Sequence, residues 1–442
     1  MSKIPEVRTE VNFVDYKDAY AAAQAVIEAN RCLFCEDAPC IQACPTAIDI
    51  PQFIRKIATE NVRGSARTIF DSNILGMSCA RVCPVEVLCV GSCVFNKLDV
   101  PPIQIGKLQR YATDLAYDKG WKFYEAGPDT GFSVAIVGAG PAGLAAAHDL
   151  RRFGHAVTMY EKRAVLGGLN STGVAPYKMR ADRAAAEVDW ILDIGGIDVQ
   201  TGVEVGEDVF WSELEAKHDA IFVAIGLGPD KHLKVPGTEL EGVHGAVDWI
   251  EQMKLGEVSL EGVERVVVVG GGNTAVDVVR EALQLGVRAV TMLYRGTEEA
   301  MSGYAHEWKA AKIEGARALW QGLPVAYLGE DRVKGVRCVR MDDDKKPIEG
   351  SEVVVGADLV LLAIGQGKLG DMVSSLDGIA VEWGVMQTEE SGATGRAGYF
   401  AGGDCANGGK EVVNAAAEGK RAAKAINGYL MQGTLTLPAE GF

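Results

Sequence analysis

Blocks of hydrophobic and polar residues alternate along this chain and predict a succession of strands and helices. Residues 132–162, FSVAIVGAGPAGLAAAHDLRRFGHAVTMYEK, contain a short apolar run, a glycine-rich turn, a segment of helical period and a second apolar run. This order is typical of a parallel β-α-β unit. It recurs in residues 265–295, RVVVVGGGNTAVDVVREALQLGVRAVTMLYR. The pattern therefore predicts two α/β units in one chain.

The first unit carries a dinucleotide-binding fingerprint in the right context. Gly138, Gly140 and Gly143 lie between the first strand and the helix, and Glu161 ends the second strand. Glycines let the backbone approach a pyrophosphate at the helix N-terminus, and the acid can bind a ribose hydroxyl. We therefore expect this unit to bind a dinucleotide.

The second unit differs at the position of the ribose acid. Gly270, Gly272 and Ala275 supply its three small positions, but its second strand ends in Tyr294 and Arg295. Ribose recognition should therefore differ between the two units. This is expected if one unit binds FAD and the other a nicotinamide nucleotide.

A third segment, residues 398–426, predicts a strand, a glycine-rich turn and an alanine-rich helix. Asp404 in this turn can hydrogen-bond the ribityl chain of a flavin, and the helix N-terminus can stabilise negative charge on the ring. If this segment completes the first unit, the second unit is inserted within it. The apolar runs at 220–228 and 358–367 would then be the crossovers.

Length and charge narrow the classes of function. A chain of 442 residues exceeds what one hydrophobic core usually serves, so we expect two to four domains. A formal net charge of −16 would repel nucleic acid and anionic membrane surfaces. The apolar runs are shorter than the roughly 18 residues that span a bilayer, and the N-terminus lacks the apolar core of a signal peptide. We expect a cytoplasmic protein with neither a nucleic-acid partner nor a membrane segment.

Eight of the ten cysteines lie in one early segment. Cys32, Cys35, Cys40 and Cys44 follow the spacing C-x2-C-x4-C-x3-C-P, and a second Cys-Pro pair begins at Cys83. Disulfides need an oxidising compartment, and structural zinc favours two C-x2-C pairs. The spacing is close to that of ferredoxins, in which the last Cys of the run ligates a second cluster. It predicts two [4Fe-4S] clusters, and eight cysteines would supply four ligands to each.

The segment NILGMSCARVCPVEVLCVGSC at 73–93, followed by PPIQIGKLQRYATD at 101–114, resembles the flavoprotein half of dihydropyrimidine dehydrogenases. In bacteria the matching protein is the separate NAD-dependent electron-input subunit of that enzyme. The chain is also similar to the small subunit of glutamate synthase, which has a shorter spacing after the Cys-Pro pair. The resemblance extends from about residue 15 to about residue 430.

The resemblance implies a ligand set that spacing alone does not. One cluster would be bound by Cys32, Cys35, Cys40 and Cys93. The other would be bound by Cys44, Cys83, Cys89 and Gln109. Cys79 would then be a non-ligand, whereas spacing alone favours it as a ligand.

The resemblance also implies cofactor-binding positions. Those for FAD are Gly138, Gly140, Gly143, Glu161, Gly168, Leu169, Lys178, Gly403 and Asp404. Relatives often have an arginine near the flavin where Lys178 stands. The nicotinamide nucleotide would lie on Gly270, Gly272, Asn273 and Thr274, next to Arg295.

The residues after Arg295 favour NADH over NADPH. Relatives that prefer NADPH follow this arginine with a second basic residue, whereas here Gly296 follows, and then Glu298 and Glu299. One arginine is a poor clamp for a 2′-phosphate, and nearby carboxylates repel that group.

The expected fold class is an α-helical iron–sulfur domain followed by an α/β flavoprotein with nested, Rossmann-like FAD and NAD(P) domains. We expect the cluster domain at 1–127, a discontinuous FAD domain at 128–245 and 357–442, and the inserted domain at 246–356. A helix over 106–125, with Gln109 near its start, would connect the cluster domain to the FAD domain.

The expected activity is an oxidoreductase that takes electrons from NADH and delivers them through the clusters to a partner subunit. Hydride transfer between nicotinamide and flavin depends on positioning more than on an acid or base, so no catalytic side chain is singled out. The resemblance implies an FMN-containing partner that reduces uracil or thymine in pyrimidine metabolism. The alternatives are the glutamate synthase small subunit, the input module of another reductase, and an assembly or redox-sensing module in which the cofactors are structural.

Three other residues, two cysteines and a histidine, are interpreted as buried, packing or surface residues without a role in the chemistry. A thioredoxin-reductase-like enzyme would need a redox cysteine pair beside the flavin, but Cys338 and Cys405 lie far apart in the sequence and outside any C-x-x-C motif. We expect each to be a small buried residue. We interpret His306 as a surface or packing residue.

Overall fold

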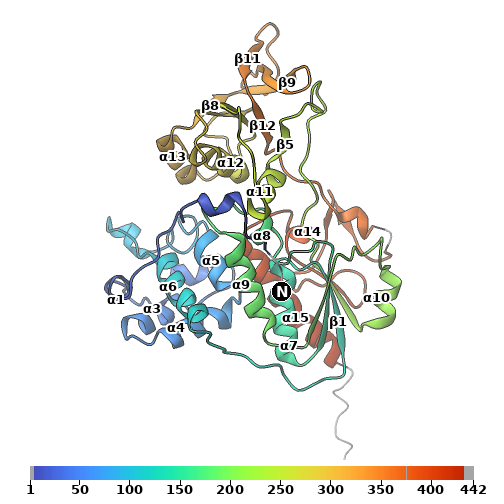
Figure 1. The fold of residues 1–442 in the computed structure, drawn as a ribbon. Helices are drawn as coiled ribbons and strands as arrows, with labels where there is room; N and C mark the ends of the chain where they lie inside the picture. Colours follow the sequence, from blue (N-terminus) through green and yellow to red (C-terminus); the bar gives the residue numbers. More distant parts are fainter. Residues whose placement is uncertain (1–3, 375, 433–442) are drawn as a thin grey trace, which may run out of the picture.

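The protein consists of three regions, shown in Figure 1 by a computed structural model that describes residues 4–374 and 376–432. A helical region lies beside a first α/β region, and a second α/β region lies above both in this view. Each α/β region is built on a five-stranded parallel sheet. The expected fold class is therefore confirmed.

Short amphipathic helices build the helical region. Ile50, Phe53, Ile54 and Ile57 recur at helical spacing in α3 and are at most 2% exposed, so they form one buried face. The Asp49 side chain caps α3 by accepting a backbone N–H. The elements are η1 (Thr9–Asn12), α1 (Ala22–Ala29), α2 (Pro39–Gln42), α3 (Ile50–Ala58), α4 (Val62–Ser72), α5 (Gly76–Val82), η2 (Val94–Leu98) and α6 (Ile105–Asp118).

The helix predicted over 106–125 ends earlier than expected, at Asp118. Gly120 has a left-handed φ of 59°, and the chain beyond it is not helical. The indole N–H of Trp190, in α9 (Ala181–Leu192), donates to the Trp121 carbonyl at 3.1 Å. A hydrogen bond to a side chain of α9 therefore takes the place of the last turns of the predicted helix.

The sheet of the first α/β region has the strand order β15-β4-β1-β2-β3. Val134, Ala135 and Ile136 of the central strand are 0% exposed, because both faces of the sheet are covered. The strands are β1 (Ser133–Val137), β2 (Ala156–Glu161), β3 (Ile197–Thr201), β4 (Ala220–Val223) and β15 (Tyr399–Ala401). The other elements are α7 (Pro141–Phe153), α8 (Leu169–Thr172), α9, α10 (Trp211–Lys217), η3 (Gly370–Met372), β13 (Val381–Glu382), β14 (Val385–Met386), α14 (Asp404–Asn407) and α15 (Val412–Met431).

The C-terminal segment completes this first sheet. β15 pairs with β4, and α15 packs along α7. The two helices approach so closely that a Cβ on Gly419 would lie 2.1 Å from the Ala142 carbonyl oxygen. The first α/β region is therefore discontinuous in sequence.

The second α/β region has the strand order β5-β12-β6-β7-β8 and carries an additional antiparallel sheet. Its parallel strands are β5 (Val243–Gly245), β6 (Arg265–Val269), β7 (Ala289–Tyr294), β8 (Arg317–Trp320) and β12 (Leu359–Leu362). Its helices are α11 (Ala246–Leu255), α12 (Asn273–Gln284) and α13 (Ala305–Glu314). The antiparallel strands are β9 (Gly322–Gly329), β10 (Val333–Arg340) and β11 (Val353–Gly356).

The inserted sheet extends beyond the expected bounds of 246–356. The short strands β5 and β12 lie outside those bounds but pair with each other, and β12 also pairs with β6. The chain crosses between the two α/β regions just after β4 and just after β12. There the two connecting segments lie side by side, with Gly228 N donating to Gly367 O at 3.0 Å.

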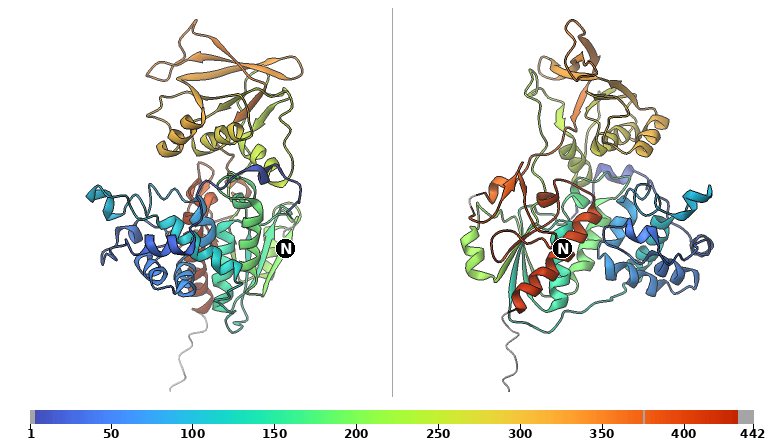
Figure 2. Two further views of the ribbon diagram at one scale, coloured as in Figure 1. Left: turned by 60° about the vertical axis from the view of Figure 1, so that its left-hand side comes forward. Right: turned by 180° about the vertical axis from the view of Figure 1, so that it is seen from behind.

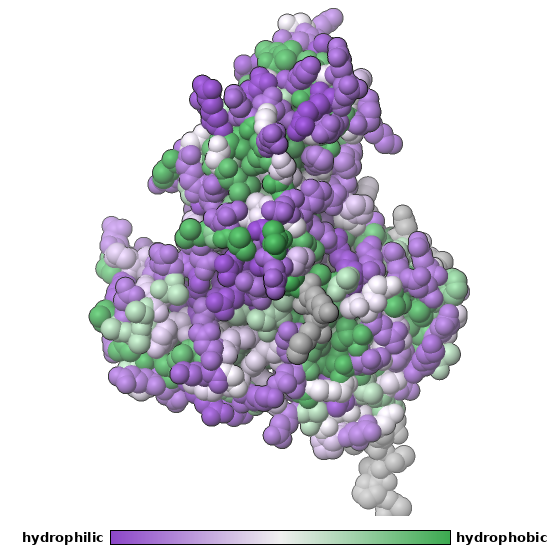
Figure 3. All heavy atoms as spheres, in the orientation of Figure 1, coloured by the Kyte–Doolittle hydropathy of each residue, from purple (hydrophilic) through white to green (hydrophobic). Residues whose placement is uncertain are grey.

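The molecular surface is mixed in character. On the face shown in Figure 3, hydrophobic side chains form separate groups among hydrophilic ones. Among the described helices, none has both the length and the apolar character needed to cross a bilayer.

Candidate functional site

The first glycine turn joins β1 to α7 and is shaped for close backbone approach. Gly138 has a φ of 103°, and a Cβ there would lie 2.4 Å from the Ala224 carbonyl oxygen. A Cβ on Gly143 would lie 2.1 Å from the Gly138 carbonyl oxygen, so this glycine allows the helix to pack on the strand. At Gly140 the nearest atom to a Cβ is 3.9 Å away. Gly140 therefore leaves an open backbone face at the start of α7, as a pyrophosphate requires.

Glu161 is held at the end of β2. Its carboxylate accepts the Ala139 N–H at 2.8 Å and the Arg163 N–H at 2.9 Å. The residue is 8% exposed and lines the pocket beside the glycine turn. This position suits the binding of a ribose hydroxyl.

One large pocket joins all three regions of the molecule. Its volume is about 480 Å³, which is in the range of cofactor sites. Eight of the nine residues expected around FAD line it; Gly143 lies behind the turn. The lining also includes Asn273, Asp277 and Tyr304 of the second α/β region and Val82 of the helical region.

Asp404 begins α14 at the wall of this pocket. Gly403 before it has a φ of 77°, and its N–H donates to the Glu418 carboxylate at 2.7 Å. The Asp404 carboxylate accepts the Lys410 N–H at 3.1 Å. Burial raises the pKa of Asp404 above its ordinary value, partly offset by that hydrogen bond. The turn thus presents a fixed carboxyl group to the pocket.

Lys178 lines the same pocket, but its ammonium is held by carboxylates of the second α/β region. It lies 2.8 Å from Asp277 Oδ1 and 2.8 Å from Glu307 Oε1. Burial opposes the charged form, yet these two acids raise the pKa of Lys178 above its ordinary value. Tyr304 makes a second link between the α/β regions by donating to Glu411 Oε1 at 2.6 Å.

The second glycine turn joins β6 to α12. A Cβ on Gly270 would lie 2.2 Å from the Ala363 carbonyl oxygen, and Gly272 precedes the first residue of α12. Asn273 accepts the Tyr304 N–H at 2.9 Å and reaches the large pocket. Gly270, Gly272, Thr274 and Arg295 are not among the residues that line it.

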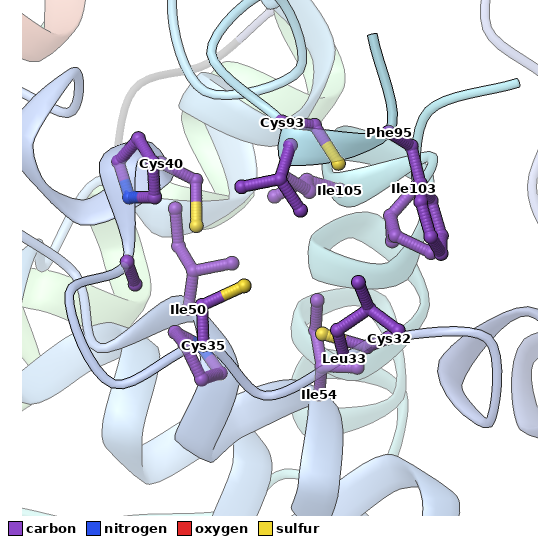
Figure 4. A pocket seen from close by; sticks show the side chains of 14 residues that line it. Cys32, Leu33, Cys35, Cys40, Ile50, Ile54, Cys93, Phe95, Ile103 and Ile105 are labelled. Atoms are coloured by element: carbon purple, nitrogen blue, oxygen red, sulfur yellow. The ribbon is translucent and has the colours of Figure 1, made fainter. Parts of the chain in front are cut away.

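Four cysteines surround a smaller cavity in the helical region. Figure 4 shows the sulfur atoms of Cys32, Cys35, Cys40 and Cys93 pointing toward a common space. Ile50, Ile54, Ile103 and Ile105 contribute to an apolar wall. Burial raises the pKa of the Cys40 thiol to about 12, so ionisation there requires a compensating positive group such as a metal. These cysteines form the first set expected from the resemblance.

Three members of the second expected set, Cys83, Cys89 and Gln109, are buried, and Cys44 is half-buried. Cys83 and Cys89 are at most 9% exposed, and burial, then Cys83 and Cys44, raise the pKa of the Cys89 thiol. Cys79 lies one helical turn before Cys83 and forms a hydrogen bond with it, which with burial raises the pKa of Cys83. The structure therefore brings Cys79 next to this set as well.

Gln109 is 7% exposed on α6, which packs against α5. Its Nε2 donates to the Gly76 carbonyl at 2.7 Å. The amide donor is therefore engaged, and Oε1 is the atom suited to a metal. No group of three or more His, Cys, Asp or Glu side chains within the described part of the chain could hold a single metal ion.

Several residues of the large pocket have no motif in the sequence. Asp277, Tyr304 and Glu307 reach it only because the second α/β region docks on the first. His306 was expected to be a surface or packing residue; it lies 3.3 Å from Glu86 of the helical region and stacks on Tyr304.

Cys338 and Cys405 are at most 4% exposed, which confirms that they are buried. Both are free thiols. Their Sγ atoms lie near backbone carbonyls.

Two protein-family models match the chain. Residues 9–121 match dihydropyrimidine dehydrogenase domain II, 4Fe-4S cluster. Residues 132–419 match pyridine nucleotide-disulphide oxidoreductase. The matches meet near the boundary between the helical region and the first α/β region.

Curated relatives match over nearly the whole chain. The glutamate synthase [NADPH] small chain of Halomonas elongata is 35% identical over 95% of this chain and 93% of its own length. The NAD-dependent dihydropyrimidine dehydrogenase subunit PreT of Escherichia coli K12 is also 35% identical, over 95% of this chain and 98% of its own.

Solved structures share the fold of the two α/β regions. FprA from Mycobacterium tuberculosis has a TM-score of 0.58 and 18% identity, covering 70% of this chain and 87% of its own. The thioredoxin reductase of Lactococcus lactis has a TM-score of 0.54 and 19% identity, covering 68% and 99%.

Proposed function

We propose that this chain, which belongs to the pyridine nucleotide-disulphide oxidoreductase family, oxidises NADH and passes the electrons through two [4Fe-4S] clusters to an FMN-containing dihydropyrimidine dehydrogenase subunit. Its relatives in this family are the glutamate synthase small chain and the dihydropyrimidine dehydrogenase electron-input subunit. Membership makes the chain an NAD(P)H-dependent flavin oxidoreductase of the electron-input type. Its cofactors are FAD, a nicotinamide nucleotide and iron–sulfur clusters.

The observation that carries the proposal is the single pocket shared by the three regions. Gly140 and Asp404 approach it from the first α/β region, and Asn273 from the second. Val82, which precedes Cys83, approaches it from the helical region. A nicotinamide, a flavin and the second cysteine set would therefore lie one after another around a single cavity.

The chain's own residues supply binding and electrostatics. When bound, FAD exchanges a hydride with the nicotinamide and single electrons with the clusters. The N-terminus of the 20-residue helix α15 borders the pocket at Glu411 and Val412. Its dipole favours negative charge at that wall. Val82, next to Cys83, lines this pocket as well, which supports the second cysteine set as the nearer electron acceptor.

Donor chemistry and burial support two cluster sites. The first would be held by the four cysteines of Figure 4. The second would be held by Cys44, Cys83, Cys89 and Gln109, with Cys79 as a neighbouring thiol. A zinc ion draws its sulfur ligands to about 2.3 Å. Within the described residues no three of these thiols are placed to hold one metal ion, which is consistent with a larger inorganic group.

Tyr294 supports the preference for NADH. Gly138 N donates to Tyr160 O and Gly270 N to Leu293 O, so Tyr294 stands where Glu161 stands in the first unit. A Cβ on Gly296 would lie 2.8 Å from the Tyr294 ring. A basic side chain at position 296 would therefore require Tyr294 to move. With glycine at this position, Arg295 is the lone clamp for a 2′-phosphate.

The choice of partner rests on the cluster region. The cysteine spacing around Cys83 resembles the dihydropyrimidine dehydrogenase pattern. The protein-family model that matches residues 9–121 is also named after that enzyme. Both kinds of relative are 35% identical, so glutamate synthase remains the second candidate.

The direct test is anaerobic reduction of the purified chain in a stopped-flow instrument. We expect NADH to bleach the flavin quickly, NADPH to do so more slowly, and cluster signals to follow in electron paramagnetic resonance. An unreduced flavin would favour an assembly or sensing module.

The partner is tested by anaerobic affinity purification from the native host. A co-purifying subunit whose addition supports NADH-dependent uracil reduction would support the proposal. A glutaminase-bearing subunit would assign the chain to glutamate synthesis.

A further inference from the structure

The N-terminal strap, residues 8–17, contacts all three regions (Figure 2). Thr9 N donates to Gly256 O at 2.8 Å, and Thr9 Oγ1 accepts the Val258 N–H at 2.8 Å. These bonds join the strap to the second α/β region. Tyr16 N donates to Tyr177 O at 2.7 Å in the first α/β region.

Charged side chains fix the strap. Glu10 is 0% exposed, pairs with Arg8 at 2.8 Å and accepts the Ala181 N–H at 2.8 Å. Arg110 of α6 pairs with Asp15 and donates to the Lys17 carbonyl. Because Arg110 directly follows Gln109, the end of the strap is fixed to the helix that carries this amide.

Lys17 lies at the end of the strap, beside the second cysteine set. Its Nζ donates to the Cys83 carbonyl oxygen at 2.7 Å. Burial lowers the pKa of Lys17 below its ordinary value, and the negative charges of Glu86, Cys83 and Cys89 oppose this shift. The Glu86 side chain is 41% exposed and lies 3.3 Å from His306.

We propose that Lys17 raises the reduction potential of the cluster bound by the second set, through the charge that the strap holds beside Cys83. The inference rests on the proposed function. A nearby positive charge stabilises the reduced cluster, which carries one more negative charge, and the effect is strong where solvent is largely excluded. A glutamine ligand in place of a thiolate acts in the same direction. Both features favour this cluster as the first acceptor of electrons from the pocket.

The test is a potentiometric titration of the full chain, loaded with FAD and clusters and followed by electron paramagnetic resonance. Lys17→Gln keeps an N–H donor for the Cys83 carbonyl but removes the charge. We expect the midpoint potential of one cluster to become more negative while the other is unchanged. Lys17→Arg should stay close to the wild type. Lys119→Gln removes the same charge from an exposed position at the far end of α6 and should change neither potential.

Each alternative result is distinguishable. Unchanged potentials in Lys17→Gln would overturn the inference, as would equal shifts in Lys17→Gln and Lys17→Arg, since the effect would then come from strap docking. Lys17→Met, which keeps the aliphatic stem, replaces the glutamine variant if that one fails to assemble. A wild-type chain that binds no clusters after anaerobic reconstitution would refute the proposed function itself.

Discussion

Gln109 decides how the second cysteine set could bind a cluster. Its Nε2 is committed to the Gly76 carbonyl at 2.7 Å, so Oε1 is the available donor. Cys79 is the competing candidate, because it lies beside Cys83. The two assignments differ in charge, since a glutamine ligand is neutral and a thiolate is not.

We predict that Gln109→Ala changes the spectrum or the midpoint potential of one cluster and leaves the FAD content intact, because the residue does not line the large pocket. Electron paramagnetic resonance, flavin extraction and iron analysis measure these quantities.

Gln104→Ala is the matched control, since Gln104 only precedes α6 and its side chain donates to the Pro102 carbonyl. Cluster signals that are identical in Gln109→Ala and the wild type would exclude Gln109 as a ligand. Loss of the same signals in Cys79→Ser would favour Cys79.

Among the elements, α9 and α5 join the first α/β region to the cluster ligands. Glu187 of α9 is 1% exposed and accepts the N–H groups of Met77 and Ser78 at 3.0 and 3.1 Å. Its other oxygen accepts the Ser78 hydroxyl. Burial raises the pKa of Glu187 to about 7, against these hydrogen bonds.

This pKa predicts a pH-dependent stability. The folded state holds the Glu187 proton more tightly than the unfolded state. The contribution of this proton to the free energy of unfolding is therefore fully present below about pH 4.5 and is lost as pH rises through about 7. The full difference is about 3 kcal/mol, since each pKa unit corresponds to about 1.4 kcal/mol.

Glu187→Gln should remove this dependence. The amide oxygen can accept both N–H groups, and the amide nitrogen can donate to Ser78 Oγ. Urea unfolding between pH 5 and pH 8 should show the wild type losing stability relative to the variant. Glu239→Gln, at an exposed position, should follow the wild type. Parallel curves for wild type and Glu187→Gln would contradict the assignment.

Local elements could be predicted from the sequence, and contacts between distant elements could not. The turns at Gly138 and Gly270 have fixed spacing because strand, turn and helix are consecutive. The end of α6 was missed, because the left-handed Gly120 and the hydrogen bond from the Trp190 indole to the Trp121 carbonyl override the helical pattern. Lys17 is not part of any sequence motif, and its position beside Cys83 follows from the path of the strap.

The limits of prediction are clearest where the α/β regions meet. Strand β5 has only three residues, and the apolar run at 358–367 that contains β12 was expected to be a crossover, so the inserted sheet was expected to be smaller. Lys178 was expected near the flavin from the resemblance, and it does line the large pocket. Its contacts with Asp277 and Glu307 depend on docking, which neither segment encodes alone.

At the scale of the whole molecule, the second α/β region must stay docked for both nucleotides to share a cavity. Lys178 is central to this contact, because its side chain is 11% exposed and lies 2.8 Å from carboxylates on α12 and α13. Lys254 of α11 adds hydrogen bonds to the carbonyls of Asn170, Val174 and Met179. The docked arrangement therefore depends on buried, charged groups.

We predict that Lys178→Met lowers the free energy of unfolding by about 3–5 kcal/mol, because two buried carboxylates lose their counter-charge. The same variant should slow flavin reduction at saturating NADH, since the nucleotide region would dock less often. Adding Asp277→Asn and Glu307→Gln should restore most of the stability, because no uncompensated charge then remains. Denaturant unfolding and stopped-flow reduction measure the two effects. If the triple variant is as unstable as Lys178→Met, the lysine stabilises the fold by packing. If the triple variant recovers its stability but no longer binds FAD, the main role of the lysine is at the flavin.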